Sequence, residues 1–420
     1  MIWKRRLTGI ITPGRVLFPL GLGTALSLMG DATLYTVLPT HAAETGIALI
    51  QVGIILSANR IVRLFLNGPM GLAYDRSRHR RLFISALFVG ALSTVLYAAT
   101  YGFWPLLVGR LLWGLAWSGI WVGGTTIILD VTTDQDRGRW TGLYQTWFFL
   151  GAAFGAFAGG LLTDQLGYHA AMWIGAAVTA FGGLIALLAL PETRGVRPEI
   201  SSSSAPNSSL EWYRNPGLWV VAVLQGINRF VFAGVLAATM ALLVQDQMSN
   251  TDLAIGTDLM IGVATLTGIL MAGRTLLSML SAPLSGTLSD RLGSRWGITT
   301  IGMVVGAVSM LLLSRSSPVS ILLGVALGAV AGGGIQSLVT AQTGDLVEQH
   351  QRGRAIGMLH TAGELGSAAG PLVAYGLLVW IGFSGIFVLS AGLFAVGAIL
   401  AWWYSRRIRS RSSGDISSRI

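Results

Sequence analysis

Seven charged side chains lie inside long apolar stretches of this 420-residue sequence. The acids are Asp31 and Glu364, and the bases are Arg60, Arg63, Arg110, Arg229 and Arg274. Ionised groups are costly in an apolar environment, so they pair, face a polar path or serve a function. A carboxyl group can carry a proton, and a guanidinium can stabilise that carboxylate or bind an anion. Proton coupling and anion binding are therefore the chemistry to examine first.

Asp31 and Arg110 lie at compatible depths, about eight and about five residues from the same end of their predicted helices. We expect them to pair, with protonation of Asp31 releasing Arg110; the alternative is a purely structural pair. Glu364 is the second candidate proton carrier. It shares a helix face with His360, four residues earlier, although a single histidine on a helix is often simply packed.

The five arginines exceed the two acids, and this positive excess favours a ligand with an anionic group. The alternative is that the arginines bond to backbone carbonyls or to the two acids. Three tryptophans follow Arg110 on one helical stripe, where they would stack on a flat substrate or pack against a neighbouring helix. The predicted substrate-binding residues are Asn59, Arg60, Arg63, Trp113, Trp117, Trp121, Gln145, Asn228, Arg229, Arg274, Gln336 and His360.

The helices that position these residues must cross a membrane, because the mean hydropathy is +0.66 and only 11% of the residues are charged. A span needs about 20 apolar residues, so the length accommodates roughly a dozen. The predicted spans are 15–39, 48–72, 82–100, 105–129, 140–163, 168–190, 216–244, 256–283, 296–314, 319–342, 355–380 and 384–404. Cysteine is absent, which excludes disulfides and thiolate metal sites.

The net charge is +10, and in the predicted topology the basic residues outside the spans all lie on one side of the membrane, except Arg315. This bias predicts a multi-pass protein of the cell membrane with both termini in the cytoplasm. Clusters such as Lys4 to Arg6 and Arg76 to Arg81 lie at membrane edges, where anionic lipids are the expected partner. A nucleic-acid partner is not expected.

The sequence repeats itself at an offset of 214 to 215 residues. Asn59-Arg60 and Pro69 match Gly273-Arg274 and Pro283, and Asp75-Arg76 matches Asp290-Arg291. The predicted organisation is a six-helix bundle over 1–190, a cytoplasmic linker over 191–215, a second six-helix bundle over 216–404 and a basic cytoplasmic tail over 405–420. Two parallel six-helix halves indicate transport by alternating access along the axis between them.

The motif Gly-x-x-x-Asp-Arg occurs twice at matched positions and resembles the signature loop of the major facilitator superfamily. The resemblance covers essentially the whole chain and implies an all-α membrane fold of 12 transmembrane helices in two pseudo-symmetric bundles. It also implies a gating role for charged and small residues at one membrane edge. These are Gly71, Asp75, Arg76, Arg80, Asp130, Arg137, Gly286, Asp290, Arg291, Asp345 and Arg352.

A glycine series in the fifth span looks like the antiporter motif of that superfamily, with Ala156 where the family has proline. Together with Asp31 and Arg110, it is most similar to the 12-helix drug:proton antiporter branch. Close helix packing alone is the alternative explanation for the glycines. The helix-packing residues we expect are Gly151, Gly155, Gly159, Gly366, Gly370 and Pro371.

The function favoured by these patterns is proton-coupled efflux of an amphipathic small molecule or drug. The proton-coupling residues would be Asp31, Arg110 and Glu364. A proton-coupled carrier of an anionic metabolite or lysolipid is the alternative, and an intramembrane enzyme is disfavoured. An ATP-binding Walker A loop is excluded because it needs a lysine and Lys4 is the only one. We expect a monomer that uses the proton gradient, without a cofactor, metal or catalytic residue.

Overall fold

A computed structural model describes residues 12–133, 135–195, 213–250, 262–315, 317–348 and 351–417. Within these ranges the regular secondary structure is entirely helical. Eleven of the described helical segments are long and apolar enough to cross a membrane. The last of them contains two of the twelve predicted spans, so the helical count agrees with the expected architecture.

The first half consists of six helices that follow one another through short connections. They are α1 (Pro13–Val37), α2 (Leu49–Arg76), α3 (His79–Ala99), α4 (Phe103–Val131), α5 (Arg137–Leu166) and α6 (Tyr168–Ala189). Glycines with positive φ begin α4 and separate α5 from α6, at Gly102 (φ 91°) and Gly167 (φ 85°). A side chain is strained in this conformation, so glycine permits these tight turns.

The second half begins with one long span that changes helix type in its middle. Its parts are α7 (Pro216–Asn228), the π-helix η2 (Arg229–Leu236) and α8 (Ala237–Asn250). The remaining helices are α9 (Val263–Leu292), α10 (Arg295–Leu313), α11 (Pro318–Asp345) and α12 (Arg352–Ser417). Gly382 interrupts α12 with φ 63°, at the point where the sequence predicts a turn between two spans.

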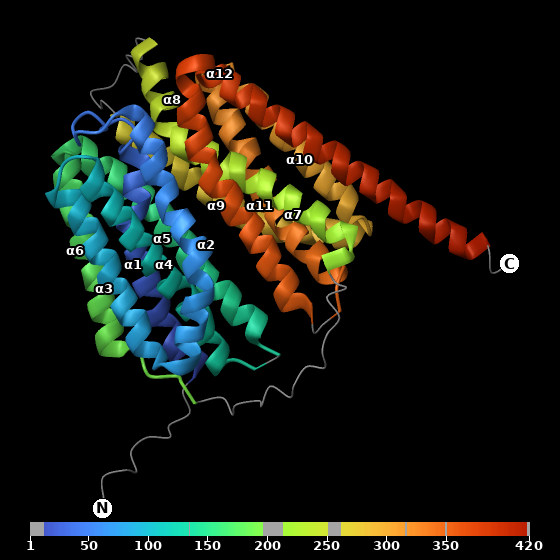
Figure 1. Ribbon diagram of the computed structural model, residues 1–420, viewed down its shortest axis with the longest axis horizontal. Helices are drawn as coiled ribbons and strands as arrows, with labels where there is room; N and C mark the ends of the chain where they lie inside the picture. Colours follow the sequence, from blue (N-terminus) through green and yellow to red (C-terminus); the bar gives the residue numbers. More distant parts are fainter. Residues whose placement is uncertain are drawn as a thin grey trace, which may run out of the picture.

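The two halves form two bundles with the same internal packing (Figure 1). In the first bundle α2 packs against α4 and α3 packs against α4 and α6; in the second, α9 packs against α11 and α10 packs against α11 and α12. Between the bundles, α5 lies against α9 and α2 lies against α12. The expected pseudo-symmetric fold is therefore present.

The bundles have two ends, which we name by the chain connections. The linker face carries the last residues of α2, α4, α6, α9 and α11, and the opposite face carries the ends of α1, α3 and α5. Figure 1 shows the ribbons of the two bundles close together near the opposite face and diverging toward the linker face.

Some predicted boundaries were wrong. The spans predicted over 48–72 and 256–283 end too early, because α2 continues to Arg76 and α9 to Leu292. Asp75 and Asp290 therefore lie in final helical turns rather than in loops. The prolines at 69 and 283 do not end these helices. Likewise, α12 continues through the predicted tail to Ser417, while residues 196–212 of the predicted linker lie outside the described part of the chain.

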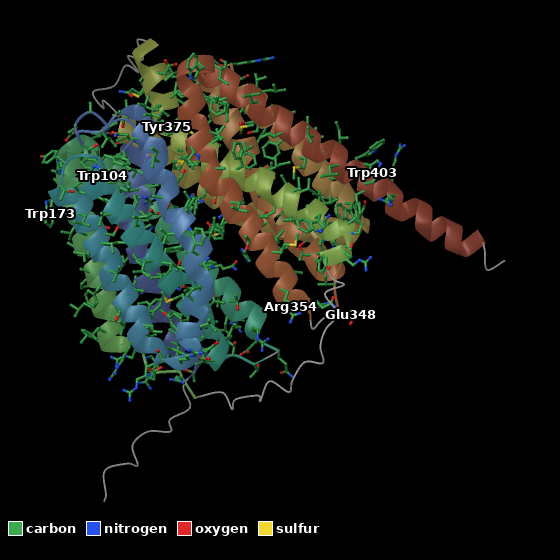
Figure 2. The ribbon with its side chains drawn as sticks, in the orientation of Figure 1. Trp104, Trp173, Glu348, Arg354, Tyr375 and Trp403 are labelled. Carbon is green, nitrogen blue, oxygen red and sulfur yellow. The ribbon has the colours of Figure 1, made fainter. Side chains whose placement is uncertain are left out.

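Large apolar side chains are exposed on the outer surface of both bundles. Trp104, Trp173 and Trp403 are 72%, 50% and 49% exposed, and Figure 2 shows them at the periphery of the molecule. A water-soluble monomer rarely exposes so much apolar surface. The outer surface is therefore suited to lipid, and the polar residues described below lie between the helices.

Candidate functional site

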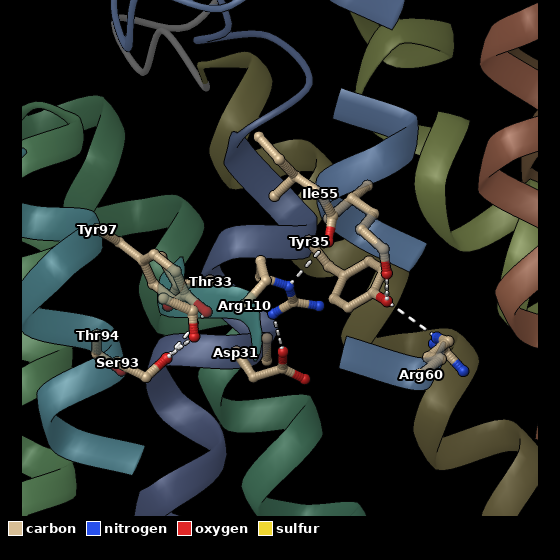
Figure 3. A network of polar contacts seen from close by, with 12 residues as sticks. Asp31, Thr33, Tyr35, Ile55, Arg60, Ser93, Thr94, Tyr97 and Arg110 are labelled. Carbon is tan, nitrogen blue, oxygen red and sulfur yellow. Dashed lines mark hydrogen bonds and ion pairs between the residues drawn. The ribbon is translucent and has the colours of Figure 1, made fainter. Parts of the chain in front are cut away.

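Asp31 of α1 and Arg110 of α4 form an ion pair within the first bundle. Nη1 of Arg110 donates to Oδ1 of Asp31 at 2.5 Å, and its Nε donates to the Ile55 carbonyl at 3.3 Å (Figure 3). The Arg110 side chain is fully buried, whereas the Asp31 side chain is 18% exposed. The predicted pairing is confirmed, and solvent can reach the acid without reaching the base.

Tyr35 connects this pair to a second arginine. Its ring lies 5.1 Å from the guanidinium carbon of Arg110 and 5.5 Å from that of Arg60. Its hydroxyl accepts from Nε of Arg60 at 3.0 Å and donates to the Leu56 carbonyl at 2.9 Å (Figure 3). Asp31, Arg110, Tyr35 and Arg60 therefore form one continuous chain of polar and cation–π contacts.

This series of contacts extends into the second bundle, where it reaches the backbone of η2. Nη2 of Arg60 donates to the Ala233 carbonyl at 3.2 Å, and Nη1 of Arg274 donates to the Phe232 carbonyl at 3.1 Å. The wide turn of a π-helix leaves carbonyls available to outside donors. Arg60 and Arg274, matched in the sequence repeat, thus meet adjacent carbonyls of one helix, as the backbone-bonding alternative predicted.

Arg63 of α2 and Glu364 of α12 form an ion pair that joins the two bundles. Nη2 of Arg63 donates to Oε1 of Glu364, and the two side chains are 14% and 12% exposed. Oε2 of Glu364 and Nε of Arg63 have no hydrogen-bond partner among the described residues. The sequence predicted both residues as functional but did not predict that they pair.

Amide side chains and Arg229 lie beside this ion pair in the second bundle. Nε2 of Gln225 donates to Oε1 of Gln336 at 2.7 Å, and Nδ2 of Asn228 donates to the Gly332 carbonyl at 3.2 Å. Arg229 interacts electrostatically with Glu364 but makes no hydrogen bond with any residue that the structure describes. The predicted residues of α7, η2, α11 and α12 are therefore brought together.

The tryptophan stripe is placed differently from the predicted substrate platform. Trp113 and Trp117 are 1% and 5% exposed and lie in the core of the first bundle. They stack at 5.9 Å between ring centroids, and Trp117 stacks on Trp121 at 5.8 Å. In this conformation Trp113 and Trp117 have no free face for a substrate, because packing uses both faces; Trp121 remains partly exposed.

Three other predicted contact residues have contrasting environments. His360 and Gln145 are exposed, and His360 lies within electrostatic range of Glu364 and Arg229. Asn59 is 2% exposed, and its Oδ1 has no hydrogen-bond partner among the described residues. The structure therefore leaves His360 and Gln145 accessible and buries Asn59 between helices.

At the linker face, Asp130 at the end of α4 binds the first residue of α3. Oδ2 of Asp130 lies 2.7 Å from Nδ1 of His79 and accepts from Thr193 Oγ1 at 2.6 Å. Nε2 of His79 lies 2.9 Å from the Tyr74 carbonyl. Both ring nitrogens of His79 therefore lie within hydrogen-bond distance of an oxygen acceptor.

The matched site in the second bundle uses an arginine instead. Arg295, the first residue of α10, donates from Nη1 to Asp345 of α11 and from Nη2 to Asp290 of α9, the latter at 3.0 Å. A pocket of about 400 Å³ lies here, lined in part by Asp290, Arg295 and Asp345. These contacts fasten helix ends within one bundle.

The remaining predicted gating residues lie at the same face. The Arg80 guanidinium donates to the Leu187 carbonyl, and Arg194 donates to the carbonyls of Arg76 at 2.8 Å and Asp75 at 3.1 Å. These contacts of the motif residues are thus within their own bundle. A Cβ added at Gly71 or Gly286 would have no neighbour within 3.5 Å. Four of the charged gating residues are exposed, namely Asp75, Arg76, Arg291 and Arg352, and Arg137 is partly buried.

The opposite face is closed by contacts between α5 and α9. The Asp164 carboxylate of α5 accepts from the backbone N–H of Thr265 at 2.6 Å, from Thr265 Oγ1 at 2.6 Å and from the Ala264 N–H at 3.3 Å. Gly160 and Gly268 allow the two backbones to approach, because a Cβ at either position would meet a carbonyl of the other helix. This contact joins the bundles where the ribbons converge.

The predicted packing glycines lie at close helix crossings. Gly151, Gly155 and Gly159 of α5 face α1, and Gly366 and Gly370 of α12 face α7 and η2. The Pro371 carbonyl lies against Gly53 of α2 in the other bundle. Small residues at these positions allow the helices to pack closely, as expected of membrane bundles.

Several residues with central contacts were missing from the sequence-based set. Tyr35, His79 and Asp164 were not selected, although Tyr35 lies one turn after Asp31, and His79 and Asp164 lie near helix ends. The η2 turn has no local sequence signal that we can identify. Its position emerges only from the packing of α7 and α12.

Comparison with known proteins identifies the family. The family model of the Major Facilitator Superfamily matches residues 20–264 and 218–419, so the chain belongs to this superfamily and is a secondary transporter rather than an enzyme. It is similar to the multidrug resistance protein MdtG of Escherichia coli, with 25% identity over 348 residues, which covers 81% of this chain and 80% of MdtG.

Solved structures share the fold at lower sequence identity. A bacterial homologue of the human lysosomal transporter Spinster, in an inward-facing and occupied conformation, has a TM-score of 0.76 at 15% identity, covering 94% of this chain and 97% of that one. The human organic anion transporter MFSD10 has a TM-score of 0.65 at 19% identity, covering 93% and 99%. The nucleoside transporter NupG has a TM-score of 0.71 at 15% identity, covering 92% and 98%.

Proposed function

We propose that this transporter exports an amphipathic small molecule in exchange for protons, by rocking its two bundles alternately open at the two faces. The observation that carries this proposal is the continuous contact chain from Asp31 through Arg110, Tyr35 and Arg60 to the Ala233 carbonyl. It links an acid that solvent can reach in one bundle to the backbone of the other. The similarity to MdtG supports drug efflux.

The chemistry follows from the charge on Asp31. As a carboxylate it fixes the fully buried Arg110, because a buried guanidinium needs a counter-ion. Protonation removes that counter-ion, and Arg110 then depends more strongly on the Ile55 carbonyl and on the Tyr35 ring. A shift of Tyr35 changes the position of Arg60 and therefore its bond across the bundle boundary. Proton uptake thereby biases the relative position of the bundles.

The direct test measures proton movement in proteoliposomes that contain the purified chain and a pH-sensitive dye. Addition of a transported compound should release protons with the wild type and with Asp136→Asn, whose carboxylate lies outside the spans. Asp31→Asn should lose most of the signal. If Asp31→Asn and Glu364→Gln both move protons like the wild type, neither acid carries the coupling.

A test in cells addresses the class of substrate. Cells that express the wild type should tolerate some amphipathic compounds better than cells that express Asp31→Asn at equal abundance in the membrane. Unchanged tolerance to every compound tested would count against drug efflux. The second candidate function, a proton-coupled carrier of an anionic metabolite or lysolipid, is favoured by the arginine excess around Glu364.

We also propose that the linker face is cytoplasmic, on the basis of the biased distribution of basic residues. The absence of cysteine makes this simple to examine. A cysteine at exposed position Arg291 should be labelled by a membrane-impermeant maleimide only from the cytoplasmic side, and one at Arg315 only from the outside. The reverse pattern would invert the topology.

A further inference from the structure

Arg229, the first residue of η2, lies between the two bundles with a guanidinium whose hydrogen-bond donors have no acceptor among the described residues. Its guanidinium makes no hydrogen bond with any described residue, although it is only partly exposed to solvent. Arg60 and Arg274 are bonded to backbone carbonyls, and Arg63 is bonded to Glu364. Arg229 therefore differs from Arg60, Arg63 and Arg274, each of which donates a hydrogen bond to a described residue.

The charges around Arg229 do not balance. Glu364 interacts with the guanidinium groups of Arg63, Arg229 and Arg60 and with His360. Asp31 also interacts with Arg60 and Arg63, but it is already ion-paired with Arg110, so Glu364 is the main counter-ion for three permanent cations. Arg274 adds a fourth cation near Arg229. Buried charges are normally paired, so this group of side chains has room for further negative charge.

Unpartnered polar atoms lie on the side chains around the same place. Glu364 Oε2, Arg63 Nε, Gln225 Oε1 and Asn228 Oδ1 have no hydrogen-bond partner among the described residues. Buried polar atoms in native structures usually have hydrogen-bond partners, so a group of unpartnered atoms at one place points to a bound ligand. Three of these atoms are acceptors, which a hydroxyl or an ordered water on the bound group would satisfy, and Arg63 Nε is a donor that an oxygen atom of the group would satisfy.

Space beside Arg229 is kept by Gly363 of α12. A Cβ at position 363 would lie 3.2 Å from Cγ of Arg229 and 3.2 Å from Nε2 of Gln225. Such contacts are tight, so a larger residue would push the arginine and the amide away. Gly363 also directly precedes Glu364, so this glycine lies beside the residue that forms the ion pair.

We propose that Arg229 and Arg63 bind an anionic group, a carboxylate or phosphate, and that Glu364 is the internal anion that this group displaces from Arg63. Guanidinium groups bind both oxyanions through paired N–H donors, which a simple ammonium cannot do. This inference rests on the proposed transport function and adds the chemical class of the group that the transporter recognises.

Because the ligand and Glu364 compete for Arg63, the proposal predicts the direction in which a change at Glu364 alters anion affinity. Removing the negative charge of Glu364 leaves Arg63 without its partner and should strengthen anion binding. The same change removes a candidate proton carrier. Anion binding and proton coupling therefore respond in opposite directions to Glu364→Gln.

The experiment measures thermal stabilisation of the purified full chain in nanodiscs, because a ligand that binds the native state raises the unfolding temperature. The probes are inorganic phosphate, decyl phosphate and decyltrimethylammonium, each titrated below its micellar concentration. The variants are Arg229→Gln, Arg229→Lys, Gly363→Val, Glu364→Gln and, as a control, Arg315→Gln at the exposed opposite face.

Decyl phosphate should stabilise the wild type and Arg315→Gln, whereas decyltrimethylammonium should not. Arg229→Gln should bind decyl phosphate about 10- to 100-fold more weakly, the loss expected for a charge-assisted hydrogen bond. Arg229→Lys, which keeps the charge, should retain part of the affinity, Gly363→Val should reduce it, and Glu364→Gln should increase it. Stabilisation by inorganic phosphate as well would identify a small-anion site, and stabilisation by decyl phosphate alone an amphipathic anion.

The inference is overturned if the cationic probe stabilises the wild type as well as decyl phosphate does, or if Arg229→Gln binds decyl phosphate normally. Either result leaves proton-coupled drug export standing. Conversely, anion binding that depends on Arg229, together with no proton movement in proteoliposomes, supports the anion site and rejects the proposed coupling. Should Arg229→Gln fail to fold, Gly363→Val and Glu364→Gln still test the site from two directions.

Discussion

Asp164 in one bundle caps the first turn of α9 in the other, where it binds Thr265, the third residue of that helix. The carboxylate accepts both the backbone N–H and the hydroxyl of Thr265 at 2.6 Å. The first N–H groups of a helix lack partners within the helix, and the helix dipole favours an anion there. A capping interaction, which usually lies within one helix, thus joins the two bundles.

Removal of this cap should favour opening at the opposite face. Asp164→Ala loses charge-assisted bonds worth ~1.5–3 kcal/mol, so the ratio of outward-open to inward-open molecules should rise about tenfold or more. Spin labels on α5 and α9 near the opposite face would report the change as a longer distance distribution. Asp136→Ala is the matched control, because Asp136 bonds to Thr133 and Trp140 in its own bundle. An unchanged distribution for Asp164→Ala would show that the cap does not bias the equilibrium.

The glycines of α5 should differ sharply in their tolerance of a side chain. A Cβ at Gly151 would overlap the backbone of Ala25 in α1, whereas Gly142 has nothing within 4 Å of that position. Gly151→Val should therefore destabilise the chain by roughly 1–3 kcal/mol through overpacking, and Gly142→Val should change little. Thermal unfolding in nanodiscs compares the two, and equal unfolding temperatures would contradict close packing as the reason for Gly151.

His79 and Arg295 perform the same task with different groups at matched helix starts. His79→Arg should therefore keep a donor against Asp130, as Arg295 provides one to Asp345, and its unfolding temperature should remain near that of the wild type. His79→Ala loses two polar contacts and leaves Asp130 with fewer donors, at a cost of about 1–3 kcal/mol. Hydrogen exchange at the end of α4 should rise in His79→Ala only. A larger loss for His79→Arg than for His79→Ala would refute the equivalence.

Asp31 and Arg110 should show strong coupling in stability. Asp31→Leu alone leaves a fully buried guanidinium without its counter-ion, at a cost of ~3–5 kcal/mol. The double variant with Arg110→Leu removes both charges and should be more stable than Asp31→Leu. Unfolding temperatures of the two single variants and the double variant form the required cycle. Additive effects would mean that the pair contributes no interaction energy.

The sequence was informative wherever hydropathy or repeated motifs were decisive. The number of spans, the two bundles and the depth of Asp31 relative to Arg110 follow from apolar length and from the 1.5 Å rise per helical residue. Helix ends were less predictable. The predicted spans stop at residues 72 and 283, yet the backbone remains helical through Asp75 and Asp290.

Specific partners across the boundary between the two bundles could not be predicted. The Arg63–Glu364 pair joins residues 301 positions apart, and nothing in the spacing of either helix specifies the other. The tryptophan stripe shows the same limitation, since its spacing fits a substrate platform and a packed core equally well. The positions of α5, with Phe148 against Trp117, and of α3, with Gly90 against Trp113, distinguish the two.

The π-helical turn over Arg229–Leu236 has a practical consequence for mutagenesis. The atoms that receive Arg60 and Arg274 are main-chain oxygens, so every amino acid at 232 or 233 still supplies them. Scanning with alanine would therefore not test these carbonyls, because position 233 is already alanine and Phe232→Ala would act through the loss of its buried ring. Deleting one residue within the turn, which converts it toward an α-helix and rotates the residues that follow, is the kind of edit that would expose it.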